Sequence, residues 1–175
     1  MVTYEEIRQL PVPEKLFSYA DSYLTAATTF CRQMAMDNNS CTWSNGAVVL
    51  MLSAHSVELF LKAAILQRNP TADVWARKHN LENLVSDFYS CFVDPAFEWD
   101  IPFKTEYPLD LDEAEISALK AGKTQPSILY RYPVGKEGTE WQGAYGFEPN
   151  SFLLLLDGVK TDFARIRSLL AASAR

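Results

Sequence analysis

The sequence has few residues that bind metals: only three cysteines and two histidines among 175 residues. The cysteines Cys31, Cys41 and Cys91 are odd in number and form no CxxC pair, which argues against a disulfide framework or a cysteine zinc site. They are more typical of buried or incidental thiols. No glycine-rich phosphate loop, GxSxG or HExxH motif is present. We therefore expect neither a metal nor a cofactor.

Long apolar runs and an excess of basic residues are also lacking. No uninterrupted apolar run approaches the roughly 20 residues that a membrane helix needs. The acidic segment 1–6 does not resemble a signal peptide. The net charge of −6 argues against broad, charge-driven nucleic-acid binding, although it allows a local basic patch. We expect one cytoplasmic domain spanning residues 1–175, without membrane contact.

What the sequence does contain is helical periodicity. Apolar residues recur alternately four and three positions apart over about 13–36 and about 151–172. The segment from about 44 to 68 is apolar nearly all round, which is typical of the central helix of a bundle. A shorter amphipathic helix is expected over about 80–92. The pattern predicts an all-α, up-and-down bundle of four main helices. The expected capping groups are Ser44, Asn45, Gly46, Asn80 and Asn150.

A segment rich in proline and aromatic residues, about 94–149, interrupts the helical pattern before the last helix. A short helix is expected over about 112–121, between acidic residues that favour its start and a glycine that favours its end. Residues 127–132 are expected to be extended, and 135–138 to turn the chain back onto 140–142 as a short β-hairpin. A long, ordered, proline-rich insertion is more often a binding element than a spacer.

One polar strip crosses the apolar central helix. His55, Glu58 and Lys62 stand at i, i+3 and i+7, within about 60° of one another at the helical repeat. Because buried charges need partners, we expect this strip to meet His79 and Arg131. Three interpretations stay open: a stabilising ion pair, a polar network that fixes the insertion, or a ligand or catalytic site.

The individual residues have structural alternatives as well. His79 would serve as a helix cap or hydrogen-bond partner at the start of its helix, and His55 as a satisfied core histidine. Tyr132 belongs to a group of aromatic residues in the insertion. Such residues either stack on bases or pack the insertion onto its domain.

Three short segments resemble the HEPN family. They are Ser53–Ala63, with an E-L-x-L-K core, His79–Leu84, which reads H-x-L-x-x-L, and Arg131–Pro133, which reads R-Y-P. The resemblance covers about residues 13–92 well and the insertion loosely. It implies an up-and-down helical bundle that often dimerises. It also implies a role with RNA or nucleotides, often in toxin–antitoxin systems or phage defence.

Many members of that family are metal-independent ribonucleases that use an arginine and a histidine four to six residues later. No histidine follows Arg165 or Arg167 in the last helix, so the catalytic pair is not carried over. The resemblance therefore favours a non-catalytic HEPN-like module that binds RNA, a nucleotide or a partner protein. The candidate ligand-binding residues are His55, Glu58, Lys62, His79, Arg131 and Tyr132.

In that module, Lys62 and Arg131 would supply positive charge for phosphate. One alternative is an atypical ribonuclease, in which His79 or His55 is the general acid or base and Arg131 stabilises the pentavalent phosphate. A second alternative is a dimeric structural domain without a ligand. The expected partners are a second copy of the chain and a nucleotidyltransferase-like antitoxin.

Overall fold

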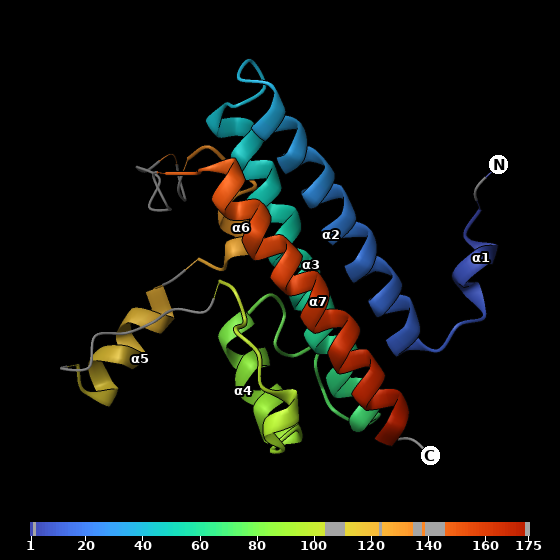
Figure 1. The fold of residues 1–175 in the computed structure, drawn as a ribbon. Helices are drawn as coiled ribbons and strands as arrows, with labels where there is room; N and C mark the ends of the chain where they lie inside the picture. Colours follow the sequence, from blue (N-terminus) through green and yellow to red (C-terminus); the bar gives the residue numbers. More distant parts are fainter. Residues whose placement is uncertain (2, 104–110, 123, 135–137, 139–145, 174–175) are drawn as a thin grey trace.

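The computed structural model describes residues 1, 3–103, 111–122, 124–134, 138 and 146–173, and for 119–122 only the backbone. Every regular element within these residues is a helix, which confirms the all-α class (Figure 1). The helices, in chain order, are α1 (Glu5–Arg8), α2 (Val12–Met36), α3 (Trp43–Arg68), α4 (Leu81–Cys91), η1 (Pro95–Phe97), α5 (Glu113–Gly122), α6 (Pro126–Leu129) and α7 (Pro149–Ser173).

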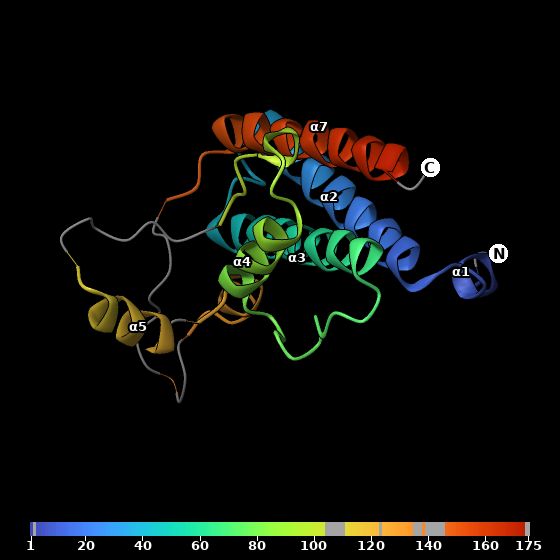
Figure 2. The ribbon, with the colours of Figure 1, turned by 90° about the horizontal axis from the view of Figure 1, so that it is seen from below.

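The three long helices α2, α3 and α7 pack together as a bundle (Figures 1 and 2). The short connection between α2 and α3 makes these two helices antiparallel neighbours. Helix α3 also contacts α4 and α6, so it is covered on several sides and the prediction of a central helix is confirmed. Helix α4 begins beside the middle of α3, because the connection Asn69–Asn80 doubles back along that helix (Figure 1).

Helix α3 is long and apolar enough to cross a membrane, judged by length and composition alone, and it is the one such helix among the described residues. This helix is not an uninterrupted apolar run, since His55, Glu58 and Lys62 lie within it. Within the structure, 78% of its most apolar stretch is buried against the other helices. Burial of this extent is typical of the core helix of a bundle.

Aromatic rings form the centre of the core. The ring of Phe60, on α3, is fully buried and stacks on Phe163 of α7 with 3.7 Å between centroids. Phe17 of α2 meets the same ring edge-on at 5.2 Å, and Trp99 does so at 6.0 Å. Such aromatic pairs add to the free energy gained by burying apolar area. Phe60 therefore joins the three long helices and the start of the insertion.

The start of α3 differs from the prediction. The hydroxyl of Thr42 caps the helix by accepting the backbone N–H of Asn45. The predicted caps Ser44, Asn45 and Gly46 lie inside the helix instead. Gly46 has another use, because a Cβ atom there would lie 3.0 Å from the ring of Phe147. The absence of a side chain lets the segment before α7 pack closely on α3.

The caps of α4 and α7 give one confirmed prediction and one error. Asn80 caps α4 as expected, since its side chain accepts the N–H of Asn83 at 2.9 Å. Asn150 lies inside α7, and the capping acceptor is the carboxylate of Glu148. This carboxylate accepts the N–H groups of Asn150 at 3.0 Å and of Ser151 at 2.6 Å.

The insertion begins as part of the core. Trp99 and Ile101, which follow η1, are buried among the long helices. The guanidinium of Arg165, on α7, donates to the backbone carbonyls of Ala96 and Glu98. This arginine therefore fastens the insertion to the last helix. Helix α5, further along, lies apart from the bundle (Figure 2).

The predicted extended segment 127–132 is wrong at its start, where α6 forms one helical turn. Pro126 suits the first helical position because its missing N–H would have no partner there. The turn and return strand of the predicted hairpin, 135–142, fall outside the described residues except for Gly138. In the described part of the insertion, all regular elements are helices.

Replacing the central ring should destabilise the whole bundle. We expect Phe60→Ala to lower the free energy of unfolding by about 3–5 kcal/mol, because it removes a buried ring and leaves a cavity. Urea unfolding followed by circular dichroism measures this change. Leu154→Ala is the control, because Leu154 is 76% exposed and should change stability by no more than about 0.5 kcal/mol. Equal effects of the two variants would contradict the central place of Phe60.

Candidate functional site

Four of the predicted site residues converge on the middle of α3. The carboxylate of Glu58, only 2% exposed, lies at the centre of this group. The ammonium of Lys62 lies 2.8 Å from Oε1, and Nδ1 of His79 lies 3.1 Å from both carboxylate oxygens. Nδ1 of His55 lies 3.5 Å from Oε2. We call these four residues the Glu58 cluster.

His79 reaches α3 because the connection before α4 is held against that helix. Lys62 donates a second hydrogen bond, of 2.5 Å, to the backbone carbonyl of Lys78. Lys78 has a φ of 49°, a left-handed conformation that residues with a side chain rarely adopt. The ammonium of Lys62 also faces the ring of Trp75, 5.7 Å from its centroid. Lys62 therefore fixes the backbone that presents His79.

One member of this site, the buried residue Ser127 on α6, was not predicted from the sequence. Its hydroxyl donates to Oε2 of Glu58 at 3.2 Å. The side chain of Gln125, just before α6, accepts the backbone N–H of Leu81 at 3.0 Å. Helix α6 is therefore joined both to the centre of α3 and to the start of α4. A lone serine carries no spacing signal that could have identified it.

The electrostatic balance keeps Glu58 ionised. Burial alone would raise the pKa of its carboxyl group, but His55, Lys62 and His79 lower it further than burial raises it. The resulting pKa is about 2. A carboxylate of this kind only accepts hydrogen bonds, so Nδ1 of His79 is the donor in their contact.

The histidines form the solvent-facing edge of the cluster. The side chain of His79 is 37% exposed and that of His55 is 21% exposed, whereas that of Lys62 is 6% exposed. The two imidazole rings lie 6.4 Å apart, and Tyr23 of α2 meets the ring of His55 edge-on at 4.8 Å. Among the described residues, the cluster is therefore most accessible to solvent at its two histidines.

Two predicted members stand apart. Arg131 and Tyr132, just after α6, are both exposed, Tyr132 to 63%. Among the described residues, no hydrogen bond or ion pair joins either side chain to Glu58, Lys62 or His79. Lys62 donates two of its three N–H groups to internal acceptors and its side chain is only 6% exposed, so little of the ammonium is accessible to a phosphate. The cluster thus favours the interpretation as a network that fixes the insertion.

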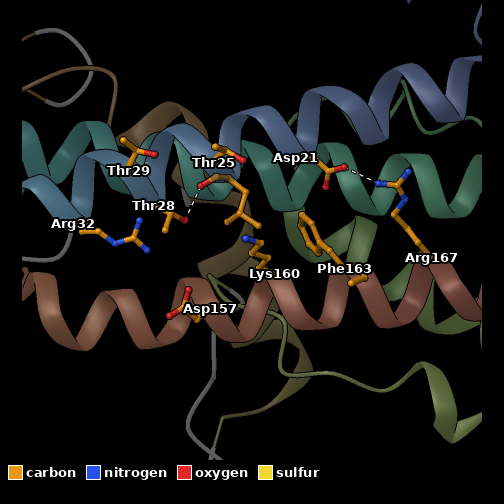
Figure 3. Close-up of a pocket in the computed structure, with 11 residues that line it drawn as sticks. Asp21, Thr25, Thr28, Thr29, Arg32, Asp157, Lys160, Phe163 and Arg167 are labelled. Atoms are coloured by element: carbon orange, nitrogen blue, oxygen red, sulfur yellow. Dashed lines mark hydrogen bonds and ion pairs between the residues drawn. The ribbon is translucent and has the colours of Figure 1, made fainter.

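A second region, which the sequence did not indicate, is an open groove between α2 and α7 (Figure 3). Its volume is about 360 Å³, within the range of small-molecule sites. Arg32 of α2 and Lys160 of α7 extend into the space between the helices, towards each other's helix (Figure 3). Three threonines of α2 belong to the lining: Thr25, Thr28 and Thr29.

Some of the charged residues in this groove form ion pairs and others do not. At one end, Arg167 forms an ion pair with Asp21 at 2.6 Å and covers the ring of Phe17. Neither Arg32 nor Lys160 forms an ion pair with any described residue. Asp157 is a further acidic residue of the lining. With Asp21 and Arg167 neutralising each other, the two cations Arg32 and Lys160 and the anion Asp157 leave the groove with one net positive charge.

No protein-family model, curated protein or solved structure matches this chain.

Removing the central charge should leave Lys62 buried without its counter-charge. We expect Glu58→Gln to lower the free energy of unfolding by about 3 kcal/mol at pH 7. Because the folded carboxyl has a pKa of about 2, below its ordinary 4.5, this stabilisation is present above pH 4.5 and is lost as the pH falls towards 2. The difference between the wild-type protein and the variant should therefore shrink over that range in urea unfolding.

The double variant Glu58→Gln, Lys62→Met is the matched control. It removes both charges, so it should lose less stability than Glu58→Gln alone. A double variant less stable than the single one would show that Lys62 contributes mainly through contacts other than its pairing with Glu58.

Proposed function

We propose that this chain is a HEPN-like helical module that binds a phosphate-bearing ligand, a nucleotide or an RNA, without cleaving it. The groove between α2 and α7 is the proposed binding site. The bundle of α2, α3 and α7 and the segments that resemble the HEPN family support this assignment.

One observation carries the proposal: two cations that form no ion pair with any described residue, Arg32 and Lys160, extend into one groove from opposite helices (Figure 3). A guanidinium and an ammonium in this arrangement can donate charge-assisted hydrogen bonds to the same phosphate. Thr25 and Thr29 belong to the lining of the same groove, and a hydroxyl group can donate to a phosphate oxygen. The ion pair of Asp21 and Arg167 closes one end of the groove.

The size and charge of the groove favour a single phosphate group over a long backbone track. Extended nucleic-acid binding uses many cations over a broad basic surface. This chain carries a net charge of −6, and the groove holds two cations that have no ion-pair partner in the described part of the chain. The proposed ligand is therefore a nucleotide, or one phosphate of a single-stranded RNA.

The arginines of the last helix also support a role without cleavage. Arg165 donates to the backbone of the insertion, and Arg167 pairs with Asp21. Both side chains thus serve the fold, and no histidine follows either of them in the sequence. The Glu58 cluster would then act as the anchor of the insertion and leave phosphate binding to the groove.

Removing either free cation should weaken ligand binding. We expect Arg32→Ala and Lys160→Ala each to raise the dissociation constant for a nucleoside triphosphate roughly tenfold or more, since a hydrogen bond to a charged group contributes about 1.5–3 kcal/mol. Isothermal titration calorimetry with ATP, GTP and a short single-stranded RNA measures this effect and separates the two sources of phosphate.

Arg68→Ala is the control, because this exposed arginine at the end of α3 changes the net charge equally without lining the groove. If Arg68→Ala weakened ligand binding as much as Arg32→Ala does, the effect would come from the net charge of the protein and not from the groove. If no phosphate ligand binds the wild-type protein but a partner protein does, the groove proposal fails.

An atypical ribonuclease is the second candidate, and one observation favours it. The carboxylate of Glu58 orients His79 through Nδ1, which leaves the other ring nitrogen of a partly exposed histidine available for proton transfer. A carboxylate that orients a histidine is common to many acid–base sites. Yet Arg131, the predicted stabiliser of the pentavalent phosphate, makes no described contact with this cluster.

The non-catalytic proposal predicts that the purified protein leaves tRNA and mRNA intact. Denaturing gels of RNA incubated with wild-type protein and with His79→Ala and Arg131→Ala should show no difference. Cleavage that disappears in His79→Ala would establish the ribonuclease and overturn the proposal. Cleavage unaffected by both variants would point to a contaminant.

The partner proposals follow from the same resemblance. A second copy of the chain could pack on α7, where Leu154 and Leu155 are 76% and 39% exposed. A nucleotidyltransferase-like protein encoded beside this chain would support a toxin–antitoxin role. These partners, and a cytoplasmic location, remain proposals.

A further inference from the structure

We propose that His55, Glu58 and His79 form a binding site for a divalent transition-metal ion of the zinc class. A ring nitrogen from each histidine and one carboxylate oxygen lie within 4.8 Å of one another. The inference uses residues outside the α2–α7 groove, so it does not depend on the proposed phosphate site.

The separations between these atoms suit one metal ion. Bonds of about 2.0–2.1 Å to nitrogen and oxygen place neighbouring ligands of a tetrahedral ion about 3.3 Å apart. Nδ1 of His79 lies 3.1 Å from Oε2 of Glu58, and Nδ1 of His55 lies 3.5 Å from the same oxygen. Both distances lie close to that tetrahedral edge. The ring nitrogens of the two histidines lie within 4.8 Å of each other, so side-chain rotations that bring them together would complete the three bonds.

His55 supplies an independent observation. Its Nδ1 atom is buried and has no hydrogen-bond partner among the described residues, although it faces the carboxylate of Glu58. A buried nitrogen without a partner costs free energy. A cation between this nitrogen and Oε2 would give Nδ1 a partner at bonding distance. Its contact of 3.5 Å with Oε2 is an ion pair only when His55 is protonated.

The two carboxylate oxygens share His79 as a partner but differ in their other partners. Lys62 donates to Oε1, whereas His55 and Ser127 approach Oε2. To bind metal, His79 would move its ring proton from Nδ1 to the other nitrogen, which its exposure to water permits. The ammonium of Lys62 would repel a doubly charged ion, so it should limit the affinity.

The set of two histidines and one glutamate fits zinc, cobalt or nickel. Imidazole suits these ions, whereas magnesium and calcium prefer oxygen ligands only. Three protein ligands leave one tetrahedral position for water on the exposed histidine side. That arrangement is typical of a zinc site open to a small ligand.

The experiment titrates untagged full-length protein with Co²⁺ and with Zn²⁺. The chain has two histidines in all, and both are in the proposed site, so histidine-dependent binding reports on it directly. We expect one ion per chain, with His55→Ala and His79→Ala each weakening binding at least about tenfold. Lys62→Met should bind more tightly than the wild-type protein, because the repelling charge is gone.

Cys41→Ser and Arg32→Ala are the controls. Cys41 is the exposed cysteine, and Arg32 belongs to the groove, so neither variant should change metal affinity. The absorption spectrum of the wild-type protein with Co²⁺ identifies the ligand atoms without any substitution. Bands of nitrogen and oxygen ligands, with no thiolate charge-transfer band, would support the site.

Three results would overturn the inference. They are the absence of binding at millimolar metal, binding that survives both histidine variants, and binding lost in Cys41→Ser with a thiolate band in the wild-type spectrum. Phosphate binding measured separately keeps the two proposals distinguishable: either site can fail while the other holds.

Discussion

The structure depends on one constraint, a carboxylate buried in the middle of its most apolar helix. Glu58 is 2% exposed, and an ionised group there must be surrounded by donors. Those donors come from α3 itself, from the connection before α4 and from α6: Lys62, His79 and Ser127. The need to satisfy one charge therefore decides where two other segments of the chain lie.

The long helices could be predicted because helical periodicity is a local property. The apolar stripes gave the extents of α2, α3, α4 and α7 to within about two residues. The caps were harder, because several polar residues compete at each helix end. Thr42 caps α3, although the caps were expected among Ser44, Asn45 and Gly46. At the start of α7 the capping residue is Glu148 and not Asn150. In the insertion, residues 127–132 were expected to be extended, but a helical turn begins at Pro126.

The candidate site was predictable only where its members lie close in sequence. Glu58 and Lys62 share one helix, so their spacing placed them together. The need of buried charges for partners indicated His79, and the family resemblance supported it, whereas Ser127 carries no pattern that distinguishes it. The groove needed the three-dimensional fold, because Arg32 and Lys160 face each other only once α2 and α7 are packed. The two regions differ physically. In the Glu58 cluster the charged groups pair with one another, whereas two cations of the groove have no ion-pair partner among the described residues.

The partners of Glu58 also differ in how soon they can reach it during folding. Lys62 is four residues away, His79 is 21 and Ser127 is 69. The first contact forms as soon as one turn of α3 does, whereas the last has to wait for closure of a long loop. A collapsed bundle without its insertion would therefore hold a partly satisfied charge at its centre. Docking of α6 completes the native contacts of that charge, so this step couples the slowest loop closure to consolidation of the core.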